Sequence, residues 1–322
     1  MAGSPHDAAV EAGKPSAEPT RRVVRIARLA YLVLAVLALG WLVFTRRGDI
    51  GRLVQGARPA LVAAALGFST LQLLLNAAFW GLGLRALGQP VAYGAVLSSS
   101  CRSLLARYLP GSVWYAVGRS ALLAREGVPK RALGVVAVLE SGLSIVVGFA
   151  LGVGLLLGTG RIPGGAGWVT AWCVVLVAAC SPPAVNAGLR LVARRRGGEA
   201  LRVSWGAFCA LLACQALFWV VAAACFAAYV HAFPALDLRP VVEVAGSFMV
   251  AWVIGFLAIF APQGLGVFEA TVTGLITDRA LASAAVVVAG FRVVSLVRDI
   301  IALAIAEIHQ ARITRRSRPG VR

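Results

Sequence analysis

The run WGAFCALLACQALFWVVAAACFAAYV, residues 205–230, contains no Asp, Glu, Lys or Arg. A helix needs roughly 20 apolar residues to cross about 30 Å of hydrocarbon, so this run predicts a membrane-spanning helix. Five other stretches are similarly long and apolar, and they occupy residues 28–46, 60–84, 132–157, 167–190 and 283–307. The sequence therefore predicts an all-α integral membrane protein with six spanning helices.

The composition agrees with a membrane protein and excludes several other classes. Of the 322 residues 60% are hydrophobic and 14% are charged, whereas a soluble domain is about 25% charged. The net charge of +18 comes from basic residues beside apolar runs, which favours membrane flanks facing anionic lipid over nucleic-acid binding. Walker, G-x-G-x-x-G and G-x-S-x-G patterns are absent, and the histidines and cysteines are too scattered for a metal site. We expect no enzyme activity, no cofactor and no metal.

Two further apolar stretches are interrupted by turn residues. Residues 92–127 are broken at Leu109-Pro110-Gly111, and residues 241–277 are broken at Ala261-Pro262-Gln263-Gly264-Leu265-Gly266. Arginines are retained on the cytoplasmic side, which places the Arg-rich loop 190–204 and the C-terminus inside and the Arg-poor loops 158–166 and 231–240 outside. Each interrupted stretch must then begin and end on one side, as a re-entrant helical hairpin does.

This order of elements predicts an inverted-topology repeat, an architecture found in many transporters. The halves would be residues 28–157 and 167–307 of a polytopic domain, 21–310, between a disordered cytoplasmic tail, 1–20, and a basic cytoplasmic tail, 311–322. Loop 47–59 disagrees, because it carries three arginines on the predicted outer side. The alternative is eight ordinary helices without symmetry.

The first break predicts an anion site. Broken helices at membrane depth are tolerated where the freed backbone is buried or lines a wet cavity. Pro110 and Gly111 allow the turn, Ser112 can cap the returning half-helix, and the positive end of that half-helix favours an anion. Arg107 and Arg119 lie on the same hairpin. The simpler interpretation is a packing kink with Arg102 and Arg107 extended to the interface.

The second break predicts buried ion pairs. Pro262, Gly264 and Gly266 form the break, and Glu269 follows in the first turn of the next half-helix. A carboxylate there costs about 2.5–3.5 kcal/mol unless it is paired. On the final span Arg292 and Asp299 share one face with Ser295, and we expect Arg292 to pair with Glu269. Glu140 lies at a similar depth in its span, and we expect it to pair with Arg119. The alternative is that both pairs only stabilise the fold.

The motifs resemble those of the lysylphosphatidylglycerol synthase transmembrane region family, which is described as flippase-like. The run from Arg107 to Arg119 followed by Glu140 resembles the first family motif, and the run from Pro262 to Glu269 followed by Arg292 is similar to the second. Two departures are Gln263, where the family usually has Gly, and the serines after Glu140, where it often has Arg and Asp. In bifunctional members this region moves a modified phospholipid between leaflets, and a separate soluble domain makes the modification. The resemblance implies a stand-alone member without the synthase domain.

Two functions from different classes follow as hypotheses. The first is a lipid translocase of the cytoplasmic membrane that carries an anionic or phosphate-bearing lipid, or a lipid-linked intermediate, between leaflets. The second is a non-transporting scaffold that partners an enzyme of envelope lipid or glycan synthesis. The translocation candidates are Arg107, Pro110, Gly111, Ser112, Arg119, Glu140, Pro262, Gly264, Gly266, Glu269, Arg292 and Asp299.

Overall fold

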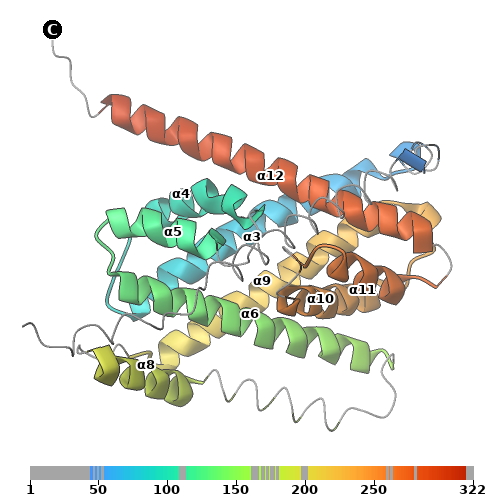
Figure 1. Cartoon of the computed structure of the whole chain (residues 1–322). Coiled ribbons are helices and arrows are strands. Elements are labelled where there is room, and N and C mark those ends of the chain that lie inside the picture. The colour runs from blue at the N-terminus through green and yellow to red at the C-terminus, as the bar shows by residue number, and fades with distance from the viewer. Residues whose placement is uncertain are drawn as a thin grey trace, which may run out of the picture.

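The computed structural model describes residues 44–45, 48, 51, 54–108, 114–160, 167, 171, 174, 178, 181–196, 202–258, 261, 264–278 and 281–316. Every regular element within these ranges is helical (Figure 1). The first predicted span, 28–46, and the tail 1–20 lie outside the described residues, apart from Phe44 and Thr45.

The regular elements keep the boundaries that the apolar stretches predict at most positions. The α-helices are α3 (Pro59–Ala86), α4 (Tyr93–Ser103), α5 (Trp114–Arg125), α6 (Lys130–Gly158), α8 (Pro182–Arg196), α9 (Trp205–His231), α10 (Val241–Leu257), α11 (Val267–Ile276) and α12 (Leu281–Arg316), and the short 3-10 segments are η2 (Leu104–Tyr108) and η3 (Pro234–Leu236).

Three described helices, α3, α6 and α9, are long and apolar enough to cross a membrane. Their mean hydropathies over the most apolar window are 1.7, 2.1 and 2.2, and each spans about 40 Å at 1.5 Å per residue. The structure describes only part of the predicted span 167–190. In this part, α8 continues to Arg196, six residues beyond the predicted end at residue 190. Helix α12 is also longer than its predicted span, which ended at residue 307.

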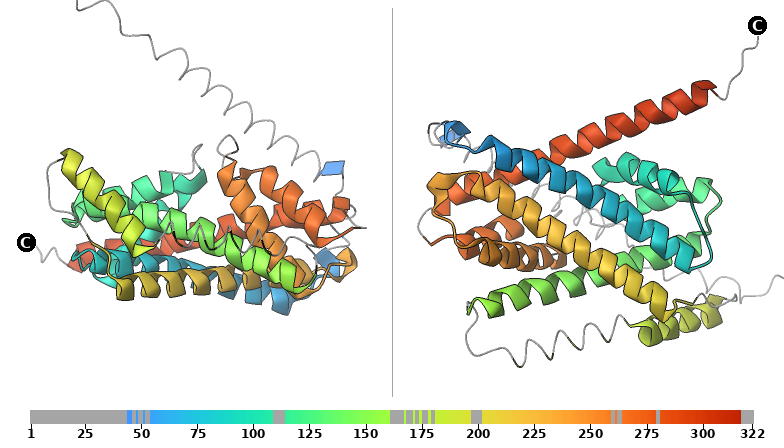
Figure 2. Two further views of the ribbon diagram at one scale, coloured as in Figure 1. Left: turned by 90° about the horizontal axis from the view of Figure 1, so that it is seen from below. Right: turned by 180° about the vertical axis from the view of Figure 1, so that it is seen from behind.

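Helices α3 and α9 form the centre of the molecule. They lie side by side along most of their length (Figure 2) and share more close contacts than any other pair of described helices. Small residues lie at this contact. The thiol of Cys225 on α9 donates a hydrogen bond to the carbonyl oxygen of Ala65 on α3 at 3.2 Å. Cys101, Cys209, Cys214 and Cys225 are all free thiols.

Each interrupted stretch folds as two helices that pack against each other. Helix α4 contacts α5, and α10 contacts α11. Helix α6 packs closely on α10 through glycines, because a Cβ atom at Gly152 would lie only 3.0 Å from the carbonyl oxygen of Gly246 and 2.8 Å from the Cβ of Met249. Small residues of this kind let helix backbones approach each other in membranes.

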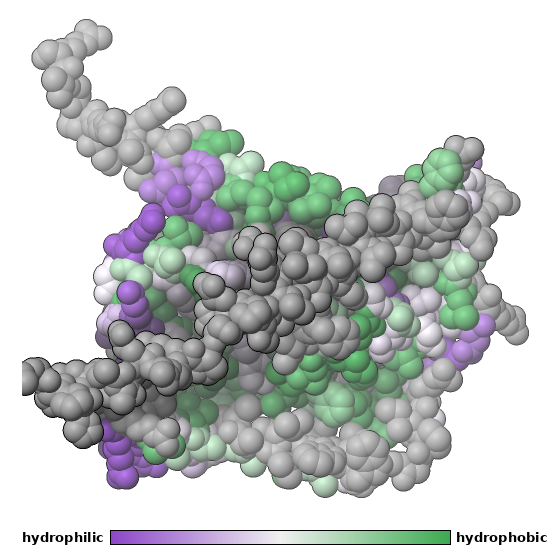
Figure 3. Space-filling view, viewed as in Figure 1, coloured by the Kyte–Doolittle hydropathy of each residue, from purple (hydrophilic) through white to green (hydrophobic). Residues whose placement is uncertain are grey.

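The connections between the helices gather at two opposite ends of the molecule. At one end, Leu87, Val128 and Val203 share an apolar cluster with the adjoining helix ends. At the other end, the backbone amide of Arg58 donates to the carbonyl of Ala232 at 2.8 Å. Figure 3 shows hydrophobic residues across the middle and hydrophilic residues gathered mainly toward the end from which α12 extends.

Candidate functional site

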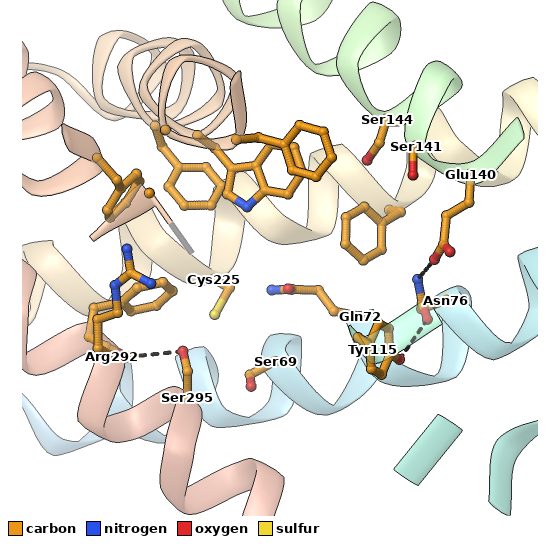
Figure 4. Close-up of a pocket in the computed structure, with 18 of the residues that line it drawn as sticks. Ser69, Gln72, Asn76, Tyr115, Glu140, Ser141, Ser144, Cys225, Arg292 and Ser295 are labelled. Carbon is orange, nitrogen blue, oxygen red and sulfur yellow. Dashed lines mark hydrogen bonds between the residues drawn. The ribbon is translucent and has the colours of Figure 1, made fainter. Parts of the chain in front are cut away.

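A cavity of about 310 Å³ is lined by residues of helices α3, α5 and α6 and of helices α9 to α12. This volume is at the lower end of the roughly 300–1,000 Å³ of small-molecule sites and fits a polar head group. Its walls come from α3, α5, α6 and α9 to α12, and from the break between α10 and α11 at Ala258, Ala261 and Gly264. Figure 4 shows Arg292 at one end of the cavity and Glu140 at the other, with Gln72 and Cys225 between them.

The Glu140 end is built by hydrogen bonds from α3 to the carboxylate on α6. The amide nitrogen of Asn76 donates to one carboxylate oxygen of Glu140 at 2.6 Å, and the indole nitrogen of Trp80 donates to the other at 2.7 Å. Each bond to a charged group contributes about 1.5–3 kcal/mol. Asn76 and Glu140 line the cavity. The carboxylate therefore faces the cavity while it accepts hydrogen bonds from two neutral donors.

Arg119 supplies the opposite charge from behind the wall of the cavity. Its side chain is fully buried, and its Nη1 lies 3.6 Å from the Glu140 carboxylate. Its Nη2 donates to the amide oxygen of Asn76 at 2.6 Å. The guanidinium lies 4.5 Å from the ring centroid of Trp80 and 4.2 Å from that of Tyr115. Such cation–π contacts stabilise a desolvated cation by about 2 kcal/mol, so the pair expected from the sequence is held by two aromatic rings as well.

Glu269 joins two elements at the other end of the cavity. One carboxylate oxygen accepts from the backbone amide of Gly266 at 2.6 Å, as in a capping box, and the other accepts from Nε of Arg292 at 2.6 Å. The guanidinium of Arg292 also lies 5.5 Å from the Phe268 ring. The structure thus brings Glu269 to the partner predicted for it, and the arginine of this pair faces the cavity.

A third ion pair, between Arg298 and Asp299, was not predicted from the sequence. The side chain of Arg298 is only 11% exposed. Its Nε donates to Asp299 at 2.8 Å, and its Nη1 donates to the hydroxyl of Ser69 on α3 at 3.0 Å. Asp299, a predicted site residue, is fully buried behind it. Sequence position gives the depth along α12, but not which neighbouring helix that depth faces.

Neutral polar side chains and aromatic rings form the rest of the cavity wall. Gln215 donates to the hydroxyl of Ser144 at 2.9 Å, and Gln72 and Ser141 lie nearby on α3 and α6. The aromatic side is continuous, because Trp252 lies 4.9 Å from Trp219 and stacks on Phe256 at 5.2 Å. The aromatic lining residues are Tyr115, Phe218, Phe248, Trp252, Phe256, Phe268 and Phe291.

The remaining predicted site residues are placed as follows. Gly264 lines the cavity with a φ of +63°, and a Cβ there would lie 2.6 Å from the carbonyl oxygen of Gly255. Gly266, with a φ of +83°, is the N-cap residue directly before α11. Four predicted residues and one side chain lie outside the described part of the molecule: Pro110, Gly111, Ser112, Pro262 and the side chain of Arg107.

Sequence reasoning missed Trp80 and Gln215. Both are ordinary members of apolar helices in the sequence, and only their position opposite Glu140 and Ser144 makes them part of the site. Asn76 gave a signal, because it continues the polar spacing of Ser69 and Gln72 along one face of α3. The described residues contain no group of three or more His, Cys, Asp or Glu that could hold a metal ion.

Comparisons with known proteins agree with the sequence motifs. A comparison with curated proteins finds none that matches. The family described as "Lysylphosphatidylglycerol synthase TM region" matches residues 28–302, which include both breaks, both predicted ion pairs and the whole cavity wall. The chain is therefore a membrane protein that belongs to the lysylphosphatidylglycerol synthase TM region family.

Proposed function

We propose that the chain crosses the cytoplasmic membrane six times, carries two re-entrant hairpins and is built as an inverted repeat. The contacts support this, because they occur in matching sets when α3 to α6 are compared with α9 to α12. Helix α3 contacts α4 as α9 contacts α10, and α5 contacts α6 as α11 contacts α12. Between the sets, α6 contacts α10 as α12 contacts α4, and α3 contacts α9. Eight unrelated helices would have no reason to repeat these contacts.

The charge distribution supports cytoplasmic termini. The end with the connections at 87–92 and 126–129 also has Arg85, Arg125 and Lys130, and Arg190 and Arg194 lie on α8 near it. At the opposite end, Arg239 pairs with Asp278 and lies 3.6 Å from Glu243, and Arg58 is also there as an exception. Lys and Arg accumulate on the cytoplasmic side.

Single cysteines test this topology in a variant that lacks the native cysteines. A cysteine in place of Glu126 is expected to react with a membrane-impermeant maleimide only after the cells are opened. A cysteine in place of Ala235 is expected to react in intact cells. Both positions are exposed. The reverse pattern would contradict the orientation.

Within this topology, we propose that the protein is a lipid translocase that moves a phosphate-bearing lipid between leaflets, and that it is not an enzyme. The carrying observation is the cavity itself, which is of head-group size, is lined by both sets of helices, and has paired charges at each end. In transporters built from inverted repeats, the substrate site lies near the membrane midplane at the repeat interface, beside broken helices.

The ion pairs suggest how the cavity would change access. Arg292 faces the cavity, and its partner Glu269 also accepts from the backbone amide of Gly266, the N-cap residue of α11. A phosphate that binds Arg292 competes with Glu269 for the guanidinium. The second hairpin would then lose its ion pair to α12, so that head-group binding is coupled to movement of that hairpin.

Leaflet transfer in proteoliposomes tests the proposal. The purified protein is reconstituted with fluorescent phospholipids, and dithionite reports the fraction that reaches the outer leaflet. Glu269→Gln is expected to slow transfer at least tenfold. Glu243→Gln is the matched control, because the arginine partner of this acid, Arg239, does not line the cavity, whereas Arg292 does. Equal rates for the wild type, both variants and protein-free vesicles across a broad lipid panel would reject the translocase. Co-purification with an envelope enzyme would then be the test of the scaffold.

A further inference from the structure

We infer that the cavity recognises a polyhydroxylated head group, a sugar or cyclitol joined to phosphate, and not an amine-bearing one. This inference rests on the proposed function, since it names the substrate class of the same cavity. The observation that suggests it is the combination of neutral hydrogen-bonding side chains with a continuous aromatic wall. The pairing of the charged residues at the site supports it as well.

The charges at the site cancel one another. Three arginines, Arg119, Arg292 and Arg298, pair with three acids, Glu140, Glu269 and Asp299. The acid at the Glu140 end faces a fully buried guanidinium, which has no other acid within salt-bridge distance in the described part of the chain. An ammonium placed there would compete with Arg119 for a single carboxylate and would leave that guanidinium buried without a counter-charge. Such an uncompensated buried charge is strongly unfavourable.

Neutral groups capable of bonding hydroxyls line the cavity between its charged ends. They comprise amides and hydroxyls from four helices: Ser69, Gln72 and Asn76 on α3, Ser141 and Ser144 on α6, Gln215 on α9 and Ser295 on α12. Amides and hydroxyls both donate and accept, which is what a row of sugar hydroxyls requires. Glu140 adds an acceptor whose lone pairs outnumber its two neutral donors. An amine needs acceptors alone, and a plain phosphate needs donors alone.

The aromatic wall fits the apolar face of a sugar ring. Trp252, Phe248 and Phe291 lie on the side of the cavity formed by α10 and α12, and Phe226 stacks on Phe248 with ring centroids 4.8 Å apart. These contacts hold the rings in place. A pyranose or cyclitol ring presents C–H groups on its faces and hydroxyls around its edge, so it can cover an aromatic ring while its hydroxyls reach α3 and α6. Arg292 and Arg298 at the far end would then meet the phosphate.

A competition experiment tests the inference. Proteoliposomes that transfer a fluorescent phospholipid are given unlabelled competitors with identical acyl chains: phosphatidylinositol, phosphatidylglycerol, phosphatidylethanolamine and a neutral monoglucosyl diacylglycerol. Phosphatidylinositol is expected to compete at least tenfold better than phosphatidylethanolamine, and the glucosyl lipid is expected to outcompete phosphatidylethanolamine as well. In parallel, the rise in the unfolding midpoint of the detergent-purified protein measures binding of the same lipids without transfer.

Variants connect the preference to the cavity. Gln72→Leu and Gln215→Leu keep side-chain size and remove hydrogen bonds, so each is expected to reduce the preference for phosphatidylinositol by about fivefold, the equivalent of about 1 kcal/mol. Gln89→Leu is the control, because this amide lies outside the cavity. Equal competition by all four lipids, or preference for phosphatidylethanolamine, would overturn the inference and leave the translocase intact. Stabilisation by phosphatidylinositol without any leaflet transfer would reject the translocase and leave the recognition in place.

Discussion

Removing the charge of Glu140 should destabilise the protein far more than removing that of a similar acid at the surface of the same molecule. In Glu140→Gln, the guanidinium of Arg119 remains fully buried and loses the carboxylate 3.6 Å away. The new amide can also accept from only one of its two present donors, Asn76 and Trp80, through its oxygen. Breaking a buried pair in this way costs about 3–5 kcal/mol.

Glu307→Gln is the matched comparison. Glu307 pairs with Arg102 at 2.6 Å, a shorter distance than in the buried pair, but the two side chains are 50% and 34% exposed. Solvent screens exposed pairs, which contribute about 0–1 kcal/mol. The shorter ion pair should therefore be the less important one for stability.

Reversible unfolding in mixed micelles measures both free energies. The double variant Arg119→Met with Glu140→Gln should lose less stability than the sum of its two single variants, because no unpaired charge remains. In such cycles, the free-energy change of the double variant differs from the sum of the two single changes by about 0.5–3 kcal/mol when the residues are in contact. If Glu140→Gln costs no more than Glu307→Gln, or if the two buried substitutions are additive, Arg119 does not depend on Glu140 and the argument fails.

Three other substitutions have calculable effects on the free energy of unfolding, measured in the same micelles. Gly152→Leu should destabilise by about 1–3 kcal/mol or more through overpacking against α10, whereas Gly154→Leu, with nothing within 4 Å, should be tolerated; equal losses would contradict the close contact. Gly264→Ala should be destabilising because φ is +63° and the Gly255 carbonyl is 2.6 Å from the new Cβ, and an unchanged midpoint would refute that geometry. Ser204→Ala removes the N-cap acceptor of α9 and should cost about 0.5–2 kcal/mol, with Ser204→Asp expected to restore most of it.

Much of the helical framework follows from the sequence because a membrane allows few alternatives. The runs that became α3, α6 and α9 need only length and apolarity to be recognised. Glu269 and Arg292 were predicted to meet because a buried carboxylate requires a partner and few bases lie at its depth. These inferences use position along one helix and the cost of burial, and both can be read from a single sequence.

The lateral arrangement of helices could not be predicted in the same way. Arg298 reaches Ser69 because α12 passes close to α3, and the spacing of residues along α12 does not indicate that approach. Trp80 became a partner of Glu140 only through the approach of α3 to α6. Such contacts depend on the rotation and tilt of helices, which packing against neighbours decides.

The glycine contact between α6 and α10 has a consequence for how the protein is made. The ribosome completes α6 before any of α10 exists, so the surface around Gly148 and Gly152 first faces lipid. In the folded protein Gly152 packs against Gly246 and Met249 of α10, and Gly148 packs against Trp219 of α9. The first half of the chain therefore completes this packing surface only after the second half has been made.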